Sequence, residues 1–286
     1  MKRNLIFWMT GLVLLGVMPF GLLAAGWGMH GGQRLASGKD EYRLEGPFTH
    51  GNLSVFLIHG KDRIKGATFI TLQEALVQRK VIVRETRSVN ELTIENVSSE
   101  EVYVQSGDIV KGGAQDRMFA TDLILPPRSG KVPISAFCVE NGRWSQRGNE
   151  SSTVFNSSAN SVASREVKLA AKMKESQGDV WKEVSVAQDK LSTNVGQRVN
   201  GAASPSSFQL ALENQQVQAN ADNYVNALDG LLDTRPDVIG YAFAINGRIN
   251  SADVYASSAL FRKLWPKLLK ASAIEAVAEL QRGQKY

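Results

Sequence analysis

The sequence predicts an α+β fold, a single domain in which a mainly antiparallel sheet is flanked by helices. Before residue 145, short runs rich in β-branched residues alternate with short turns. Such turns suit antiparallel strands, whereas parallel strands need longer crossover connections, usually helices. A second β-rich pair, split by Asn246-Gly247, is expected to form a hairpin that joins the same sheet. Helical segments are expected to occupy most of residues 165–232.

Residues 1–26 are typical of an export signal. Lys2 and Arg3 precede an apolar, uncharged run over residues 5–23, and small residues follow it. The run is also long enough to cross a bilayer, so a retained membrane anchor is the alternative. Pro19 and the small residues favour a cleaved signal. In both cases the rest of the chain is expected outside the cytoplasm, in the periplasm or cell envelope or secreted.

A folded domain is expected over residues 46–286. Residues 27–45, rich in glycine, serine and charge, are expected to form a flexible tether before it. Thr71 and Glu74 have the spacing of a capping box, in which each side chain hydrogen-bonds the backbone N–H of the other residue, so a short helix begins there. Strands are expected at residues 53–59, 80–86, 91–97, 101–104, 108–110, 118–125 and 131–139.

The second half of the chain is expected to be mainly helical. Its Ser-, Asn- and Gly-rich part, residues 145–164, is expected to be a long loop that could act as a lid, and residues 194–204 a further loop. Pro266 lies inside the last helix and is expected to kink it or to begin a second helix. Helices are expected at residues 165–177, 180–191 and 259–281, and one helix or a helix pair at 208–232. The hairpin strands are expected at 238–245 and 248–255.

Composition excludes several functional classes. The formal net charge is +5, to which Lys2 and Arg3 contribute, and no dense block of basic residues occurs, so nucleic acid is not an expected partner. The single cysteine excludes an intramolecular disulfide. The three histidines lack the spacing of metal ligands, and no phosphate-loop or dinucleotide-binding motif is complete. We therefore expect neither a metal nor another cofactor.

Residues 107–144 contain most of the chemically unusual side chains. Gly112 and Gly113, next to Lys111, could turn backbone N–H groups toward an anion, because glycine adopts the backbone conformations that form anion-binding nests. A tight turn or bulge between strands is the alternative.

Gln115, Asp116 and Arg117 follow at the start of an expected strand. Alternation places Gln115 and Arg117 on one face of this strand and Asp116 on the other. Arg117 is a candidate anion clamp. The alternative is a buried tie, from Asp116 to Arg117 or to the backbone, that only holds the loop.

Cys138 alternates with Ile134 and Ala136 on one strand face, which predicts a packed core thiol rather than a nucleophile. Glu140 continues this face past the end of the strand. It is a candidate general base, or a partner for Arg143.

Arg143 and Trp144 follow an Asn-Gly turn. Trp144 could stack on a sugar or a base, or it could anchor the edge of the sheet. If the strands at 118–125 and 131–139 pair as a hairpin, Arg117 comes opposite residue 139 or 140. Cations, a carboxylate and an indole would then gather at one rim.

These residues also suggest a family. The runs GDIVKGGAQDR and LPPRSGKVPISAFCVENGRW resemble the bacterial and archaeal domain called the ADP-ribosylglycohydrolase and rhodanese-phosphatase superfamily-associated protein domain. The segments ITLQEAL, VIVRET and VIGYAFAINGRINSADVY extend the resemblance over residues 45–280. The family name records neighbouring genes, so the resemblance implies a link to ADP-ribose or other nucleotide-derived metabolites and no particular reaction.

Three functional hypotheses follow. The first is a binding module for a polar, anionic small molecule or glycan, with contacts from Lys111, Gly112, Gly113, Gln115, Arg117, Arg143 and Trp144. The second is a hydrolase of the same class of ligand with Glu140 or Asp116 as the catalytic base. The third is a structural envelope protein that binds only other proteins. Binding is favoured because sequence spacing places no acid–base pair.

Overall fold

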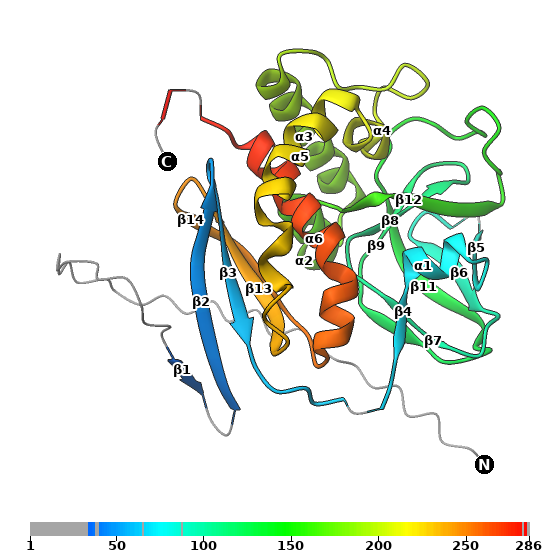
Figure 1. Cartoon of the computed structure of the whole chain (residues 1–286). Helices are drawn as coiled ribbons and strands as arrows, with labels where there is room; N and C mark the ends of the chain where they lie inside the picture. Colours follow the sequence, from blue (N-terminus) through cyan, green and yellow to red (C-terminus); the bar gives the residue numbers. More distant parts are fainter. Residues whose placement is uncertain (1–33, 38–39, 65, 87, 282, 285–286) are drawn as a thin grey trace.

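The computed structural model describes residues 34–37, 40–64, 66–86, 88–281 and 283–284. Two β-rich bodies lie on either side of a layer of helices (Figure 1). This arrangement confirms the predicted α+β class and the mainly antiparallel pairing. The expected signal or anchor at residues 1–26 lies outside the described residues. Among those described, no helix has both the length and the apolar character that a membrane span requires.

The first β body is a five-stranded antiparallel sheet that brings the two ends of the domain together. Its strands, in spatial order, are β1 (Arg34–Ser37), β2 (Asp40–His50), β3 (Leu53–His59), β13 (Val238–Ile245) and β14 (Arg248–Val254). Asn246 and Gly247 have φ values of 52° and 73°, the left-handed values of a two-residue hairpin turn. The predicted hairpin is therefore confirmed, although it belongs to a separate sheet from most of the earlier strands.

The start of this sheet corrects one prediction. Residues 40–45, expected in a flexible tether, form the first part of β2. Their backbone pairs with β3, with Arg43 opposite His59 and Glu45 opposite Leu57. Polar composition did not indicate a strand here because the pairing partner is supplied by a neighbouring segment.

The second β body is a closed six-stranded barrel with its own core. Its strands, in spatial order, are β11 (Gly130–Cys138), β6 (Glu91–Asn96), β5 (Val81–Glu85), β12 (Val154–Val162), β8 (Asp108–Gly112) and β9 (Arg117–Phe119). Large apolar side chains fill it, among them Leu92, Ile94, Phe119 and Phe155, none more than 2% exposed. Closure of the barrel leaves it without open sheet edges.

A small three-stranded sheet lies against the barrel. It contains β10 (Leu123–Leu125), β7 (Glu101–Val104) and β4 (Phe69–Thr71), and α1 (Leu72–Val77) follows β4 directly. The predicted capping box begins α1: the Thr71 hydroxyl accepts from the Glu74 N–H at 3.2 Å, and the Thr71 N–H donates to the Glu74 carboxylate at 2.7 Å. Because both contacts are local, sequence spacing alone was sufficient to predict them.

Two predictions about barrel strands were wrong. Residues 118–125 are not one strand, because β9 remains in the barrel while β10 pairs with β7. Asp122, between them, accepts a hydrogen bond from the Ser106 N–H at 3.1 Å, which holds the chain where it leaves the barrel. Residues 145–164 are not wholly a loop, because β12 pairs with β5 and β8 and places Phe155 in the barrel core.

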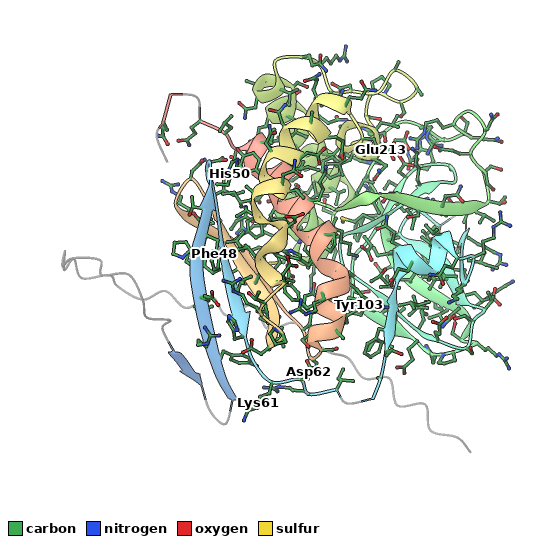
Figure 2. The ribbon with its side chains drawn as sticks, in the orientation of Figure 1. Phe48, His50, Lys61, Asp62, Tyr103 and Glu213 are labelled. Atoms are coloured by element: carbon green, nitrogen blue, oxygen red, sulfur yellow. The ribbon has the colours of Figure 1, made fainter. Side chains whose placement is uncertain are left out.

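Helices and their side chains fill the space between the two β bodies (Figures 1 and 2). They are α2 (Arg165–Met173), α3 (Gln177–Val195), α4 (Phe208–Leu212), α5 (Gln215–Leu228), the 3₁₀ helix η1 (Asp229–Leu232) and α6 (Ser258–Ala278). α6 is apolar on most sides, as expected for a helix buried between layers. It continues through Pro266 to Ala278, so the alternative of a second helix starting at Pro266 was wrong.

Candidate functional site

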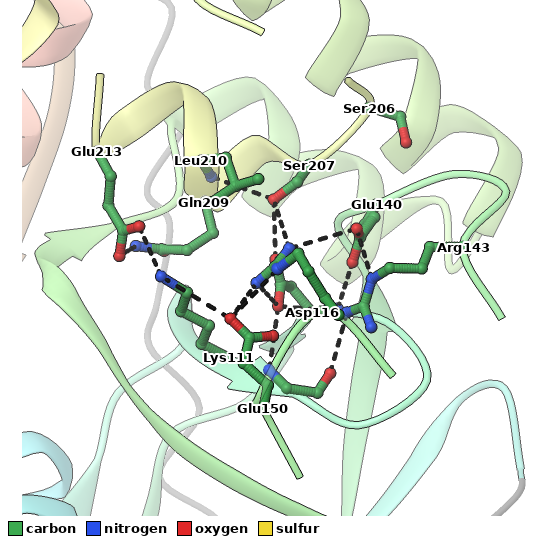
Figure 3. A network of polar contacts seen from close by, with 12 residues as sticks. Lys111, Asp116, Glu140, Arg143, Glu150, Ser206, Ser207, Gln209, Leu210 and Glu213 are labelled. Carbon is green, nitrogen blue, oxygen red and sulfur yellow. Dashed lines mark hydrogen bonds and ion pairs between the residues drawn. The ribbon is translucent and has the colours of Figure 1, made fainter. Parts of the chain in front are cut away.

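A network of charged side chains braces three loops at one end of the barrel (Figure 3). The loops follow β8, follow β11 and lead into α4. The network contains Lys111, Asp116, Glu140, Arg143, Arg147, Glu150, Ser207, Gln209 and Glu213. It therefore unites four of the residues proposed from the sequence with five that were not.

Asp116 is the centre of this network. Arg147 donates two hydrogen bonds to its carboxylate, from Nη1 to Oδ2 at 2.8 Å and from Nη2 to Oδ1 at 2.9 Å. The Ser207 hydroxyl donates to Oδ2 at 2.8 Å, and the Gly112 N–H donates to Oδ1 at 3.1 Å. Asp116 is completely buried, and burial raises its pKa although the hydrogen bonds from Arg147 oppose the shift. Both oxygens thus serve as acceptors within the fold.

Glu140 is the second buried carboxylate and contacts the first loop directly. Its Oε2 accepts from the backbone N–H of Asp116 at 2.9 Å, and its Oε1 accepts from Arg143 Nε at 2.7 Å. Burial alone would raise the pKa of Glu140, but hydrogen bonds from Arg143, Ser204 and the Asp116 N–H together lower it. Glu140 is therefore held as an anion, and its predicted partnership with Arg143 is present.

Arg143 ties the Gly112-Gly113 turn to Glu140. Its Nη1 donates to the Gly113 carbonyl at 3.0 Å and its Nη2 to the Gly112 carbonyl at 3.1 Å. Both glycines have positive φ, 126° and 57°, a backbone conformation that glycine adopts more easily than other residues. Their N–H groups bond Asp116 and the Ser151 carbonyl, so the turn presents its carbonyls to Arg143 rather than its N–H groups to an anion.

The outer part of the network is accessible to solvent. Lys111 is partly exposed and donates to Glu213 at 2.7 Å, and Gln209 supports the same carboxylate at 2.9 Å. Glu213 lies where the helices face the barrel (Figure 2). Trp144 is 59% exposed, although its neighbour Arg143 has a buried side chain. Lys111 and Trp144 are therefore the proposed binding residues that a ligand can reach most directly.

Arg117 does not join this network. It lies opposite Cys138 in the barrel ladder, one position from the predicted partner, and its guanidinium contacts Glu85 at 3.3 Å and the Cys138 sulfur at 2.6 Å. It also donates to the Val89 carbonyl. The expected pairing of the two strands is present for residues 117–119 and 136–138. The expected joint site of the Arg117 and Glu140 side chains is wrong, because the two side chains have different partners.

Gln115 is completely buried, and neither polar atom of its amide has a hydrogen-bond partner among the described residues. We expect Gln115→Met to increase the free energy of unfolding by about 1–3 kcal/mol, because an unsatisfied buried amide costs about that much. Urea unfolding monitored by circular dichroism measures the change. The matched control is Gln209→Met, which removes a satisfied buried amide and should lower stability. A loss at Gln115 as large as at Gln209 would show that the Gln115 amide has a partner.

Cys138 is completely buried, which confirms the predicted core thiol. Burial raises its pKa from 9.0 to about 11, with Arg117 opposing the shift. A raised pKa favours the neutral thiol in the folded state, so its stabilising contribution is complete below about pH 9 and is lost as the pH rises toward about 11.

We therefore expect the wild-type protein to lose about 2 kcal/mol more stability than Cys138→Ala between about pH 8 and about pH 11. Urea unfolding of both proteins at each pH measures this difference. At neutral pH the substitution should cost about 1–3 kcal/mol through lost packing. Rapid modification of the native thiol by a disulfide reagent at neutral pH would contradict the prediction.

Sequence spacing did not indicate five members of this network, namely Arg147, Glu150, Ser207, Gln209 and Glu213. Arg147 and Glu150 fall in the region expected to be a polar loop, and their opposite charges at i, i+3 are the one local signal. Ser207 lies 91 residues from its partner Asp116, so no spacing rule connects them. Such contacts depend on the closure of the barrel.

Metal binding has no support at this site. Its two central carboxylates are occupied by arginines. Over the part of the chain that the structure describes, no group of three or more His, Cys, Asp or Glu side chains is arranged to hold a metal ion.

Fold and site together define an α+β domain in which a buried ion-pair network braces the loops at one end of a barrel. A comparison with protein families matches residues 41–286 to the ARG and Rhodanese-Phosphatase-superfamily-associated Protein domain, ARPP-1. The match covers most of the chain, so the chain belongs to this family, and the resemblance noted in the sequence is confirmed. Searches of curated proteins and of solved structures gave no significant match.

Proposed function

We propose that this domain is a binding module for a polar, anionic small molecule with a ring or sugar face, bound at a rim formed by Lys111 and Trp144. The observation that carries the proposal is the exposure of Trp144 between two buried arginines. Arg143 and Arg147 are fixed by Glu140 and Asp116, so the backbone of Trp144 is held while its indole remains in solvent. An exposed indole on a fixed backbone offers a flat apolar face on which a ring can stack.

The buried ions support this proposal energetically. Charges taken out of water carry a large desolvation cost, and an apolar core of the same volume is often at least as stable. We therefore attribute to this network a role in fixing the positions of the loops rather than in adding stability. Here it holds Gly112, adjacent to Lys111, against the loop that carries Trp144. Preorganised loops reduce the entropy lost on binding.

Lys111 would contribute the charge. Its partner Glu213 is partly exposed, and an anionic group of the ligand can replace this carboxylate at the ammonium group. The family link to nucleotide-derived metabolites suggests compounds that combine phosphate, ribose and a base. Phosphate would contact Lys111, and the base or sugar would stack on Trp144.

One observation favours a hydrolase as the second candidate. Asp116 and Glu140 are adjacent carboxylates whose pKa values are displaced in opposite directions, a pattern found in acid–base pairs. Both are completely buried and hydrogen-bonded to arginines. A substrate would reach them only after the Arg147 loop opened, so binding without turnover is the better-supported function.

The test uses ADP-ribose, ribose 5-phosphate and ribose as probes, with tryptophan fluorescence and calorimetry as readouts. We expect saturable binding of the first two, loss of the fluorescence change in Trp144→Ala, and a weakening on the order of tenfold in Lys111→Ala, since a charged hydrogen bond is worth about 1.5–3 kcal/mol. Lys131→Ala, which removes an exposed lysine from β11, is the matched control. Binding that is unchanged in Trp144→Ala, or no binding of the phosphorylated probes, would refute the proposal.

Hydrolysis of ADP-ribose to AMP and ribose 5-phosphate, followed by chromatography, would instead favour the hydrolase. We further propose that the protein acts outside the cytoplasm, supported by the signal-like residues 1–26. Cell fractionation and sequencing of the mature N-terminus near Ala25 or Gly26 test this. A cytosolic protein that retains Met1 would contradict it.

A further inference from the structure

A large cavity lies away from the ion-pair network. It has a volume of about 720 Å³ and opens between α2, α3, the β13–β14 hairpin and the C-terminal part of α6. Figure 1 shows the C-terminal part of α6 close to the β13–β14 hairpin. This volume is within the range of small-molecule sites. None of the network residues lines it, so it is independent of the Lys111–Trp144 rim.

Glu275 of α6 lies in the wall of this cavity. Its Oε1 accepts from the Arg165 N–H at 3.0 Å, and its Oε2 accepts from the Asn250 amide at 3.1 Å. No lysine or arginine among the described residues forms an ion pair with it. Burial raises the pKa of Glu275, although the nearby charge of Lys168 opposes the shift. A carboxylate in such surroundings is stabilised by any cation that enters.

Asn250 is placed by an irregularity in the sheet. The β13–β14 register shifts between the pairs Phe243–Ser251 and Ala244–Ile249, which leaves Asn250 as an extra residue, a β-bulge. Bulges re-aim side chains and are common beside functional sites. The Asn250 Nδ2 bonds Glu275, whereas its Oδ1 is buried and has no hydrogen-bond partner among the residues described. The cavity wall therefore has both an uncompensated carboxylate and an unused acceptor.

Two further features border the same cavity. Arg248, at the start of β14, is exposed and makes no ion pair within the described part of the chain. Glu275 also lies in the wall of a separate, small apolar cavity of about 20 Å³, which is lined by Leu191, Phe208 and Ile274 among others. The site thus offers an anion, a free cation and room for a small apolar group.

We propose that this cavity is a second binding site, for a zwitterionic α-amino acid with a small apolar side chain. The ammonium group takes Glu275 as its counter-ion, and a small rotation of the Asn250 amide lets Oδ1 accept from it. The carboxylate of the ligand meets Arg248, whose fork geometry suits carboxylates. The side chain enters the small apolar cavity.

The probes are L-alanine, L-valine, isobutylamine, which is valine without its carboxylate, and isovalerate, which is valine without its amine. Saturation-transfer NMR and calorimetry on the full-length protein report binding. We expect the two amino acids to bind, isobutylamine to bind more weakly and isovalerate not to bind. Absence of binding by both amino acids, or isovalerate binding as tightly as L-valine, would overturn the proposal.

Glu275→Gln should weaken amino-acid binding at least about tenfold, the loss expected for one charged hydrogen bond. It should retain the native circular dichroism spectrum and an equal or higher melting temperature, because a flipped Asn250 amide can pair with the new amide. Glu183→Gln is the matched control, since Glu183 also lines the cavity but does not contact Asn250. Unchanged binding in a folded Glu275→Gln protein, or equal losses in the two variants, would refute the assignment.

Arg248→Ala provides a second test that does not depend on the core, because Arg248 is exposed. It should reduce the affinity for L-valine to that for isobutylamine and leave isobutylamine binding unchanged. A variant that binds L-valine as the wild type does would contradict the proposed orientation. Trp144→Ala should not alter any of these affinities, so failure of the rim proposal and failure of this one are distinguishable.

Discussion

Asp116→Ala is expected to lower the free energy of unfolding by about 3–5 kcal/mol, the cost of breaking a buried ion pair from one side. The substitution would leave Arg147 buried without its two short hydrogen bonds and would remove the acceptor of the Gly112 N–H and the Ser207 hydroxyl. Unpaired buried polar groups retain their desolvation cost. Urea unfolding at neutral pH, monitored by circular dichroism, measures the loss.

Two further variants separate the ion pair from other effects. Glu166→Ala removes a carboxylate from an exposed ion pair with Arg165 and should cost less than about 1 kcal/mol. The double substitution Asp116→Leu with Arg147→Met removes both charges and should recover part of the loss, because Arg147 is then no longer buried without its Asp116 partner. Similar losses in Asp116→Ala and Glu166→Ala would show that the buried network contributes little to stability.

The elements predicted correctly are those whose cause is local. The Thr71–Glu74 capping box depends on two residues three positions apart, and the hairpin depends on the left-handed preference of Asn246 and Gly247. Alternation along the strand was also sufficient to place Cys138 in the core. Each of these sequence patterns spans only a few residues, and the tertiary packing agrees with the local structure that the pattern predicts.

The errors occurred where distant partners determine the structure. The polar strand β12 forms because β5 and β8 pair with its backbone, and no pattern in Ser- and Asn-rich residues indicates this. Residues 118–125 alternate like one strand, yet Asp122 holds the chain as it turns away from the barrel. Strand register and barrel closure depend on pairs of residues that lie far apart in the sequence. Local sequence patterns do not show which distant segments will pair.

The candidate site shows the same division. The sequence indicated that residues 107–144 gather unusual charges, and Lys111, Asp116, Glu140 and Arg143 do belong to one network. Arg117 was assigned to it wrongly because its guanidinium contacts Glu85, the Cys138 sulfur and the Val89 carbonyl instead. The remaining partners come from the loops around Arg147 and Ser207, which only the folded chain brings to Asp116.

Lys267 and Asp108 form a second buried ion pair, which links α6 to β8 of the barrel. Each residue is only 5% exposed, and Asp108 also accepts from the Gln105 N–H at 2.9 Å. Lys267→Met preserves the helix and most of the side-chain volume but leaves the Asp108 carboxylate buried without a cation. We expect it to lower the free energy of unfolding by about 3–5 kcal/mol.

Lys270→Met is the matched control for this prediction, because Lys270 lies on the same helix and pairs with Asp222, which is half exposed. It should cost less than about 1 kcal/mol, since solvent screens that pair. Adding Asp108→Asn to Lys267→Met should recover part of the loss, because the amide oxygen still accepts from Gln105 and no buried charge remains. If the two lysine substitutions cost the same, the Lys267–Asp108 pair does not join the barrel to the helical layer, and apolar packing around α6 alone holds the two β bodies together.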